Sequence, residues 1–254
     1  MRLPKTWRGP WIGLAAAVCI LATGPAVGGE AAMTPAERQA IEQVVREYLR
    51  DNPEILVDAI RALRVKQEIA KRAEARRALA GNRQRLDSDP DSPVAGDARG
   101  DVTVVEFFDY RCTYCKRVFP SIMALLETDR RIRYVFKEFP ILGPASDIAA
   151  RAALAAWYMD QSAYLPLHRA LMAAKGGLTE GRIMRFAEDV GLDIAELRRT
   201  MKGSRVEAQL KANFELARAL GINGTPAFVI GSEIVPGAAD IASLRRLIAA
   251  ARKG

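Results

Sequence analysis

Hydrophobic residues between positions 34 and 86 recur at helical spacing and form one apolar stripe. The segment opens with Thr34–Glu37, where threonine can cap a helix, proline fits its first turn and glutamate completes a capping box. Asn52-Pro53 offers a second cap and a break, because proline cannot donate the helical hydrogen bond. The pattern predicts an N-terminal helical segment at residues 31–86, built as a helix pair or one sharply kinked helix. The stripe consists of Ile41, Val44, Val45, Tyr48, Leu49, Leu56, Ile60, Leu63 and Ile69.

This stripe needs a partner, because an isolated helix of such length is only marginally stable in water. It can pack on the rest of the chain or on the same stripe of another copy, and we favour a homo-oligomer formed through residues 34–86. The basic residues of the run 71–85 alternate with alanine and glutamate and lack interleaved aromatic residues. We interpret them as a solvated helix face and expect no nucleic-acid partner.

Residues 87–100 are rich in aspartate, serine, proline and glycine, which is typical of a linker. The hydrophobic pattern then changes from helical spacing to a short apolar run typical of a strand buried on both faces. The predicted elements after the linker are strand 102–108, helix 113–127, strand 132–139, a block of helices at about 145–220, a strand pair at 227–230 and 233–235, and helix 241–251. This order predicts an α/β protein in which residues 101–254 form a thioredoxin fold with a helical insertion.

The first thirty residues differ from the rest in pattern. Arg2, Lys5 and Arg8 precede an apolar run that ends in small residues, which is the layout of a cleaved secretory signal. An uncleaved anchor helix is the alternative, but glycines and a proline interrupt a run barely long enough to span a bilayer. We therefore predict a signal peptide at residues 1–30, no stable membrane span, and a periplasmic protein.

Composition narrows the function further. Half of the 254 residues are hydrophobic and 27% are charged, which is typical of a globular protein rather than a disordered or multi-span one. Loss of residues 1–30 removes three basic groups and one acidic group, which lowers the formal net charge from +8 to +6. It also removes Cys19, which follows Val18 rather than the small residue of a lipoprotein signal. Two of the three cysteines, Cys112 and Cys115, remain.

Cys112 and Cys115 form a Cys-x-x-Cys directly after a predicted buried strand, at the start of a predicted helix. At the helix N-terminus Cys112 meets free backbone N–H groups, which stabilise a thiolate and lower its pKa. We expect Cys112 to be the exposed nucleophile of thiol-disulfide exchange and Cys115 the shielded thiol that resolves the mixed disulfide. Zinc would need two further ligands, and with only His168 available we predict no metal, no cofactor and no role for His168. A purely structural disulfide would close a very short loop, so it is not favoured.

Three segments, Phe107–Arg117, Gly224–Phe228 and Val235–Ala238, are similar to the DsbA family of periplasmic thioredoxin-superfamily proteins, over about residues 100–252. The resemblance implies that Thr225 and Pro226 carry a cis-proline loop that binds extended substrate beside the cysteines. It also implies that Glu106 is a buried acid that assists proton transfer at Cys115. A pairing of Glu106 with Lys137 is the alternative.

Thr113 and Tyr114 lie between the cysteines, where many oxidases of this family have proline and histidine. Tyr114 before the second cysteine and Thr225 before the proline instead resemble the related disulfide isomerases, which oligomerise through an N-terminal region. The predicted function is a thiol-disulfide oxidoreductase that acts on cysteines of exported proteins and is recycled by a redox partner. Oxidation, isomerisation and reduction stay open as directions. A chaperone-like or metal-handling binding protein with a secondary dithiol is the alternative.

Overall fold

The computed structural model describes residues 33–253, so the predicted signal peptide at residues 1–30 lies outside the described range. The chain divides into two compact units, one ending at Arg61 and one beginning at Ala62. The described helices are α1 (Pro35–Asp51), α2 (Glu54–Gly81), α3 (Arg83–Asp87), α4 (Thr113–Thr128), α5 (Pro144–Met159), α6 (Gln161–Ala173), α7 (Glu180–Asp189), α8 (Ile194–Met201), α9 (Ser204–Ala219) and α10 (Ile241–Ala251). The strands are β1 (Val94–Gly96), β2 (Val102–Phe108), β3 (Ile132–Glu138), β4 (Ala227–Ile230) and β5 (Glu233–Pro236).

The helix pair predicted from the apolar stripe is present as α1 and α2, which residues 52–53 separate. The Thr34 hydroxyl accepts a hydrogen bond from the Glu37 N–H at 3.3 Å, and the Glu37 carboxylate accepts one from the Thr34 N–H at 2.8 Å, which completes the predicted capping box. No residue of α1 is buried. Most of the stripe is exposed in a single chain, with Val44 65% and Ile69 64% accessible.

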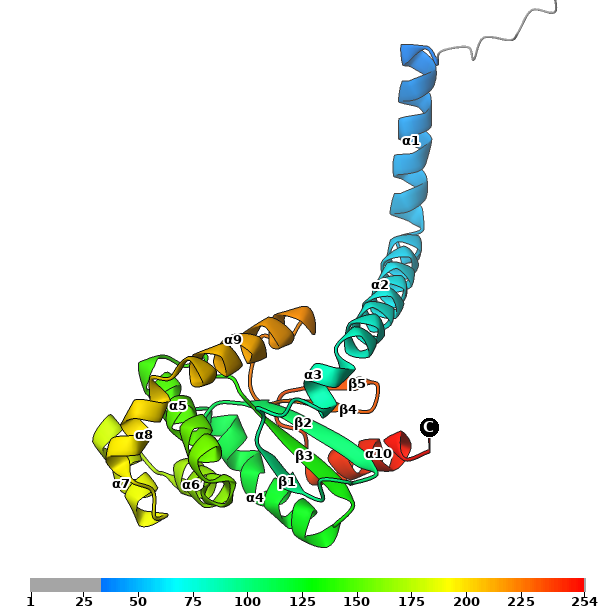
Figure 1. The fold of residues 1–254 in the computed structure, drawn as a ribbon. Coiled ribbons are helices and arrows are strands. Elements are labelled where there is room, and N and C mark those ends of the chain that lie inside the picture. Colours follow the sequence, from blue (N-terminus) through cyan, green and yellow to red (C-terminus); the bar gives the residue numbers. More distant parts are fainter. Residues whose placement is uncertain (1–32, 254) are drawn as a thin grey trace, which may run out of the picture. The chain divides into compact units, whose positions relative to one another are not determined.

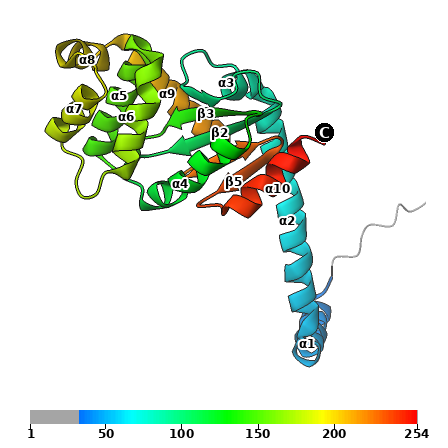
Figure 2. The ribbon, with the colours of Figure 1, turned by 90° about the horizontal axis from the view of Figure 1, so that it is seen from below.

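A five-stranded sheet forms the centre of the second unit, in the order β1-β3-β2-β4-β5 (Figures 1 and 2). β2 and β3 are parallel, while β1, β4 and β5 each run antiparallel to their neighbour. Nearly every residue of β2 is buried, as the unbroken apolar run predicted. The sheet is that of a thioredoxin-like fold, which confirms the predicted fold class.

Hydrophobic side chains on the two faces of the sheet form separate cores. On one face, Val104, Phe108, Tyr134 and Phe136 pack with α4, α10 and the helices of the insertion. On the other face, the end of α2 together with α3 and α9 covers the strands (Figure 1). The helical block predicted at about 145–220 is present as α5–α9, between β3 and β4. None of the helices within residues 33–253 is both long enough and apolar enough to span a membrane.

The predicted linker at residues 87–100 contains β1, an edge strand of the sheet. Its polar residues have a structural task that composition does not reveal. The Lys137 ammonium, 1% exposed, donates to the Asp89 carboxylate and to the Ser92 hydroxyl, both at 2.7 Å. The Gln209 amide, on α9, donates to the same two groups at 2.8 and 3.0 Å. Because an unpaired buried charge is strongly destabilising, this network ties the segment to the sheet and to α9.

The boundary between the units also differs from the predicted end of the helical segment at residue 86. Leu79 on α2 and Leu86 on α3 are 1% and 0% exposed and belong to the second core of the sheet. The C-terminal part of α2 is therefore part of the thioredoxin-like unit.

Candidate active site

The loop between β2 and α4 carries the dithiol, and Asp109 fixes its conformation. The Asp109 carboxylate accepts hydrogen bonds from the Arg111 N–H at 2.7 Å, the Ser146 hydroxyl at 2.8 Å and the Leu142 N–H at 3.0 Å. Its carbonyl accepts the Cys112 N–H at 3.1 Å. One buried side chain thus holds the turn before Cys112 and fastens it to the start of the helical insertion.

Cys112 is the N-cap residue of α4, as its position after a strand predicted, and both thiols are free. Its sulfur accepts the Cys115 N–H at 3.3 Å. The hydrogen bond from the Cys115 thiol, aided by the Thr225 side chain and backbone N–H groups, outweighs burial and lowers the pKa of Cys112 to about 6. The expectation that Cys112 is exposed is wrong for the free chain. It is only 5% exposed, because the loop that carries Thr225 lies over it.

Cys115 is 1% exposed and has the opposite ionisation. Its hydrogen bond to Cys112, its burial and the nearby Glu106 carboxylate all raise its pKa, far above the usual value for a thiol. The two sulfur atoms therefore share one proton at neutral pH, with Cys112 as the thiolate and Cys115 as the thiol.

Thr225 and Pro226 lie opposite the dithiol, in the loop between α9 and β4, and are joined by a cis peptide bond. The Thr225 carbonyl oxygen is 3.2 Å from the Cys112 sulfur, which donates to it when protonated. The Pro226 carbonyl accepts the Gly237 N–H at 2.8 Å, which holds the loop against the end of β5. When Cys112 is ionised, the Thr225 carbonyl is free to accept a hydrogen bond from another chain.

Glu106 is 2% exposed, on the face of β2 that bears the dithiol. Its carboxylate accepts the Tyr134 hydroxyl at 2.7 Å. Burial raises the pKa of Glu106 to about 8, with a smaller contribution from the negative charge of Cys112, while the bond from Tyr134 opposes the rise. The alternative pairing with Lys137 does not occur, because side chains alternate along strands and Lys137 lies on the other face of the sheet with Asp89.

Sequence reasoning missed a second buried network beside this site. The Tyr110 hydroxyl, two residues before Cys112, lies 3.0 Å from a Glu138 carboxylate oxygen and 2.9 Å from His168 Nδ1. The Tyr164 hydroxyl donates to the same Glu138 oxygen at 3.1 Å. Burial lowers the pKa of His168 to about 3, so its ring is neutral, and it raises the pKa of Glu138. A lone histidine in a helix carries no signal for such a role, although Tyr110 stands inside the dithiol motif.

Within residues 33–253 there is no cluster of three or more histidine, cysteine, aspartate or glutamate side chains suited to a metal ion. The site itself brings together one activated thiolate, one buried thiol, one buried carboxyl and the Thr225 carbonyl acceptor.

A thioredoxin-like sheet with a dithiol at the N-terminus of its first core helix defines the class of thiol-disulfide oxidoreductases. Comparison with known proteins agrees. The model of the DsbA-like thioredoxin domain matches residues 103–249, more than half of the chain. The chain therefore belongs to the DsbA-like thioredoxin family, and the resemblance inferred from the motifs is confirmed. A second model, for the N-terminal domain of the copper resistance protein ScsC, matches residues 37–70.

Solved structures support the same assignment. A thioredoxin-like oxidoreductase from Silicibacter pomeroyi is 45% identical, with a TM-score of 0.66 over 68% of this chain and 99% of that one. ScsC from Proteus mirabilis, in a transitional conformation, is 34% identical, with a TM-score of 0.64 over 87% and 99%. A periplasmic thioredoxin-like protein from Salmonella enterica serovar Typhimurium is 29% identical, with a TM-score of 0.60 over 68% and 96%. The predicted enzyme class is thus shared by the structural neighbours.

Some curated relatives are much longer. The Na(+)/H(+) antiporter NhaA 1 of Salinispora arenicola is 31% identical over 169 residues, which are 65% of this chain. The chain spans about a quarter (26%) of that protein's length.

The ionisation of the dithiol is directly testable. Titration of thiolate absorbance in the reduced protein should show one thiolate, with a midpoint near pH 6. Cys115→Ala should move the Cys112 midpoint upward, because it removes the largest cause of the low pKa. Cys112→Ala should show no thiolate at neutral pH. An unchanged midpoint in Cys115→Ala would mean that the helix N-terminus alone sets the pKa.

Glu106 should make the stability of the reduced protein depend on pH. Its folded-state pKa of about 8 exceeds the ordinary 4.5, so the unfolded chain loses this proton first and stability falls as pH rises from 4.5 to 8. Glu106→Gln cannot ionise, and Tyr134 can still donate to its amide oxygen. In urea unfolding, the variant should gain about 3 kcal/mol relative to wild type between pH 4.5 and pH 7. A difference independent of pH would contradict a raised pKa for Glu106.

Proposed function

We propose that this protein is a disulfide isomerase of exported proteins, with Cys112 as the nucleophile that opens incorrect disulfides. The observation that carries the proposal is the Cys112 sulfur itself, whose pKa is lowered to about 6 and which lies 3.2 Å from the Thr225 carbonyl. At neutral pH such a residue is mostly thiolate, the form that attacks disulfides. Thr113 and Tyr114 provide no imidazole of the kind found in many strong oxidases, and Tyr114 and Thr225 resemble the corresponding residues of disulfide isomerases.

The proposed reaction begins with attack of the Cys112 thiolate on one sulfur of a substrate disulfide. A bond between Cys112 and that sulfur forms as the substrate disulfide breaks, and the second substrate sulfur leaves as a thiolate. This thiolate attacks another disulfide of the same substrate, and the thiolate released there displaces Cys112. No net electrons are transferred.

Cys115 can release the substrate when the mixed disulfide with Cys112 does not rearrange. It loses its proton and attacks the Cys112 sulfur, which releases a reduced substrate thiol and leaves a Cys112–Cys115 disulfide. We propose Glu106 as the acceptor of that proton. In the mixed disulfide Cys112 carries no charge, so one of the causes that raise the pKa of Glu106 is gone and the carboxylate forms more readily. A redox partner must then reduce the disulfide.

Thr225 and Pro226 are the proposed substrate-binding residues. Ionisation of Cys112 leaves the Thr225 carbonyl without its sulfur donor, so it can accept an N–H from an extended substrate segment. The substrate would then lie against the loop with its cysteine beside Cys112.

We further propose that the protein acts in the periplasm, after removal of residues 1–30, and assembles into oligomers through residues 34–86. The basic head, apolar run and small residues at the start of the chain support export, and the likeness to a periplasmic neighbour agrees. The exposed apolar stripe on α1 and α2 supports self-association.

The exchange chemistry has a direct test. Reduced wild-type protein should restore activity to ribonuclease carrying scrambled disulfides, and Cys112→Ala should not, because it lacks the nucleophile. Cys115→Ala should accumulate a mixed disulfide with the substrate on a non-reducing gel, because release through Cys115 is blocked. Absence of the mixed disulfide would contradict Cys112 attack. Oxidation of reduced ribonuclease without rescue of the scrambled form would make the protein an oxidase.

Self-association can be tested in the full chain by placing a charge in the stripe. Val44→Glu should lower the molar mass measured by light scattering to that of a monomer, because it buries a carboxylate in the proposed interface. Gln39→Glu is the matched control: it adds the same charge on the opposite face of α1 and should leave the oligomer intact. A monomeric wild-type protein would refute the interface.

A further inference from the structure

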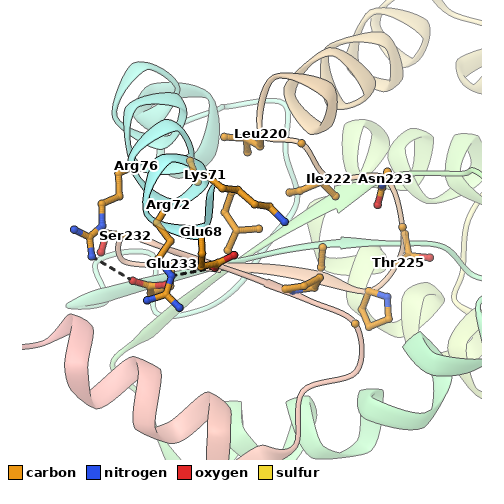
Figure 3. A pocket seen from close by; sticks show the side chains of 18 residues that line it. Glu68, Lys71, Arg72, Arg76, Leu220, Ile222, Asn223, Thr225, Ser232 and Glu233 are labelled. Carbon is orange, nitrogen blue, oxygen red and sulfur yellow. Dashed lines mark hydrogen bonds and ion pairs between the residues drawn. The ribbon is translucent and has the colours of Figure 1, made fainter. Parts of the chain in front are cut away.

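A groove with a volume of about 680 Å³ leads away from the candidate active site (Figure 3). Its walls are residues 68–76 of α2, residues 220–227 before and at the start of β4, and residues 232–237 of the β4–β5 hairpin. All of these residues belong to the second unit. The groove includes Thr225 and Pro226, so a chain held beside Cys112 can continue into it. We call it the α2 groove.

The charges along the α2 groove are unequal. Arg72 donates to Glu68 at 3.1 Å, and Arg76 lies 3.9 Å from Glu233, so these two arginines are balanced. Lys71 has no ion pair or side-chain hydrogen bond with any residue in the described part of the chain. Figure 3 shows its side chain extending away from the arginines, toward the loop that carries Ile222 and Thr225. One unbalanced positive charge therefore lies between the groove wall and the substrate-binding loop.

The other surfaces of the α2 groove fit an extended polypeptide. Within the described residues, β5 pairs only with β4, so its outer edge offers free backbone groups. Ile234, which is partly buried, adds apolar area to the lining, and Leu220 and Ile222 border the groove from the core, 6% and 7% exposed. Backbone donors and acceptors beside apolar side chains are what an extended segment requires, whereas a small free anion would use neither.

The hollow on the other side of Thr225 has no excess of positive charge in its lining. It has a volume of about 740 Å³ and is lined by residues of α4 and the start of α10. Its charged lining residues are one cation, Arg117, and one acid, Asp240. A substrate lying across Thr225 thus meets a net positive charge on one side only.

We propose that the α2 groove binds the segment of the substrate polypeptide adjacent to the target cysteine, and that Lys71 selects segments with aspartate or glutamate there. The inference rests on the proposed thiol-disulfide exchange and names its preferred substrate class. Lys71 acts as a specificity residue, because it contacts the flanking segment and not the reacting sulfur atoms.

The test measures how fast reduced full-length protein reduces single-cysteine peptides, each carried as a mixed disulfide with 2-mercaptoethanol. The peptides differ only in a glutamate or lysine, placed three residues before or three residues after the cysteine. On one side only, the glutamate peptide should react about two- to fivefold faster than the lysine peptide, the effect expected of a solvent-accessible ion pair. The difference should disappear in 1 M salt.

Two variants assign the effect to Lys71. Lys71→Glu should reverse the preference, so that the lysine peptide reacts faster on that same side. Lys66→Glu makes the same charge change on α2 but outside the α2 groove, and should keep the wild-type preference. A preference that survives Lys71→Glu, or equal rates for both peptides in wild type, would overturn the proposal.

Bis(2-hydroxyethyl) disulfide, which is small and uncharged, separates this inference from the proposed function. If wild type reduces it but shows no charge preference among the peptides, the α2 groove proposal fails and the exchange chemistry stands. If wild type reduces neither this disulfide nor any peptide, the proposed function fails, and the inference fails with it.

Discussion

One proton shared between two sulfur atoms is the interaction on which the rest of the site depends. The Cys115 thiol donates to the Cys112 sulfur, so one residue becomes a thiolate and the other keeps its proton far beyond the usual range. The fold creates this asymmetry by placing Cys112 at the first free N–H groups of α4 and Cys115 one turn deeper, over the sheet. The same asymmetry supports the proposed roles, in which Cys112 attacks a substrate and Cys115 resolves the mixed disulfide.

Several buried ionisable groups lie on the two faces of the sheet, and the pKa of each is set by a different combination of burial, hydrogen bonds and nearby charges. The Glu106 carboxyl accepts one hydrogen bond, from the Tyr134 hydroxyl, and its pKa is raised to about 8, so it can hold or accept a proton. Glu138 and His168 are joined through Tyr110, and burial raises the pKa of Glu138 and lowers that of His168. Burial lowers the pKa of Lys137, and its ion pair with Asp89 at 2.7 Å opposes that shift. The carboxyl of Glu106 lies on the dithiol face and interacts electrostatically with the Cys112 sulfur, which is why we propose it as the proton acceptor.

The sequence predicted the fold class because the relevant signals are local: a capping box, an apolar strand run, and a Cys-x-x-Cys at a strand–helix junction. The sequence did not predict features that depend on contacts between segments far apart in the chain. β1 is three residues long and sits in a polar stretch, and its residues form a strand because they pair with β3. The sequence around Asp89 predicts a linker, because the partner of its carboxylate, Lys137, lies 48 residues further along the chain. The exposure of Cys112 depends on a loop 113 residues away, and His168 acquires partners only when α6 packs beside β3 and the active-site loop.

Lys71 lies on α2, the helix that forms one wall of the α2 groove. α2 is a continuous helix, and its residues carry part of the exposed apolar stripe as well as one wall of the α2 groove. The dithiol, by contrast, takes its partners from β2, β3, α4 and the Thr225 loop, with none from α2. The elements that hold the dithiol thus differ from α2, which carries the proposed specificity residue Lys71, and Thr225 belongs to both the active site and the α2 groove. A change along residues 68–76 can alter which segment is held beside Cys112 while the pKa values of the two thiols stay as they are.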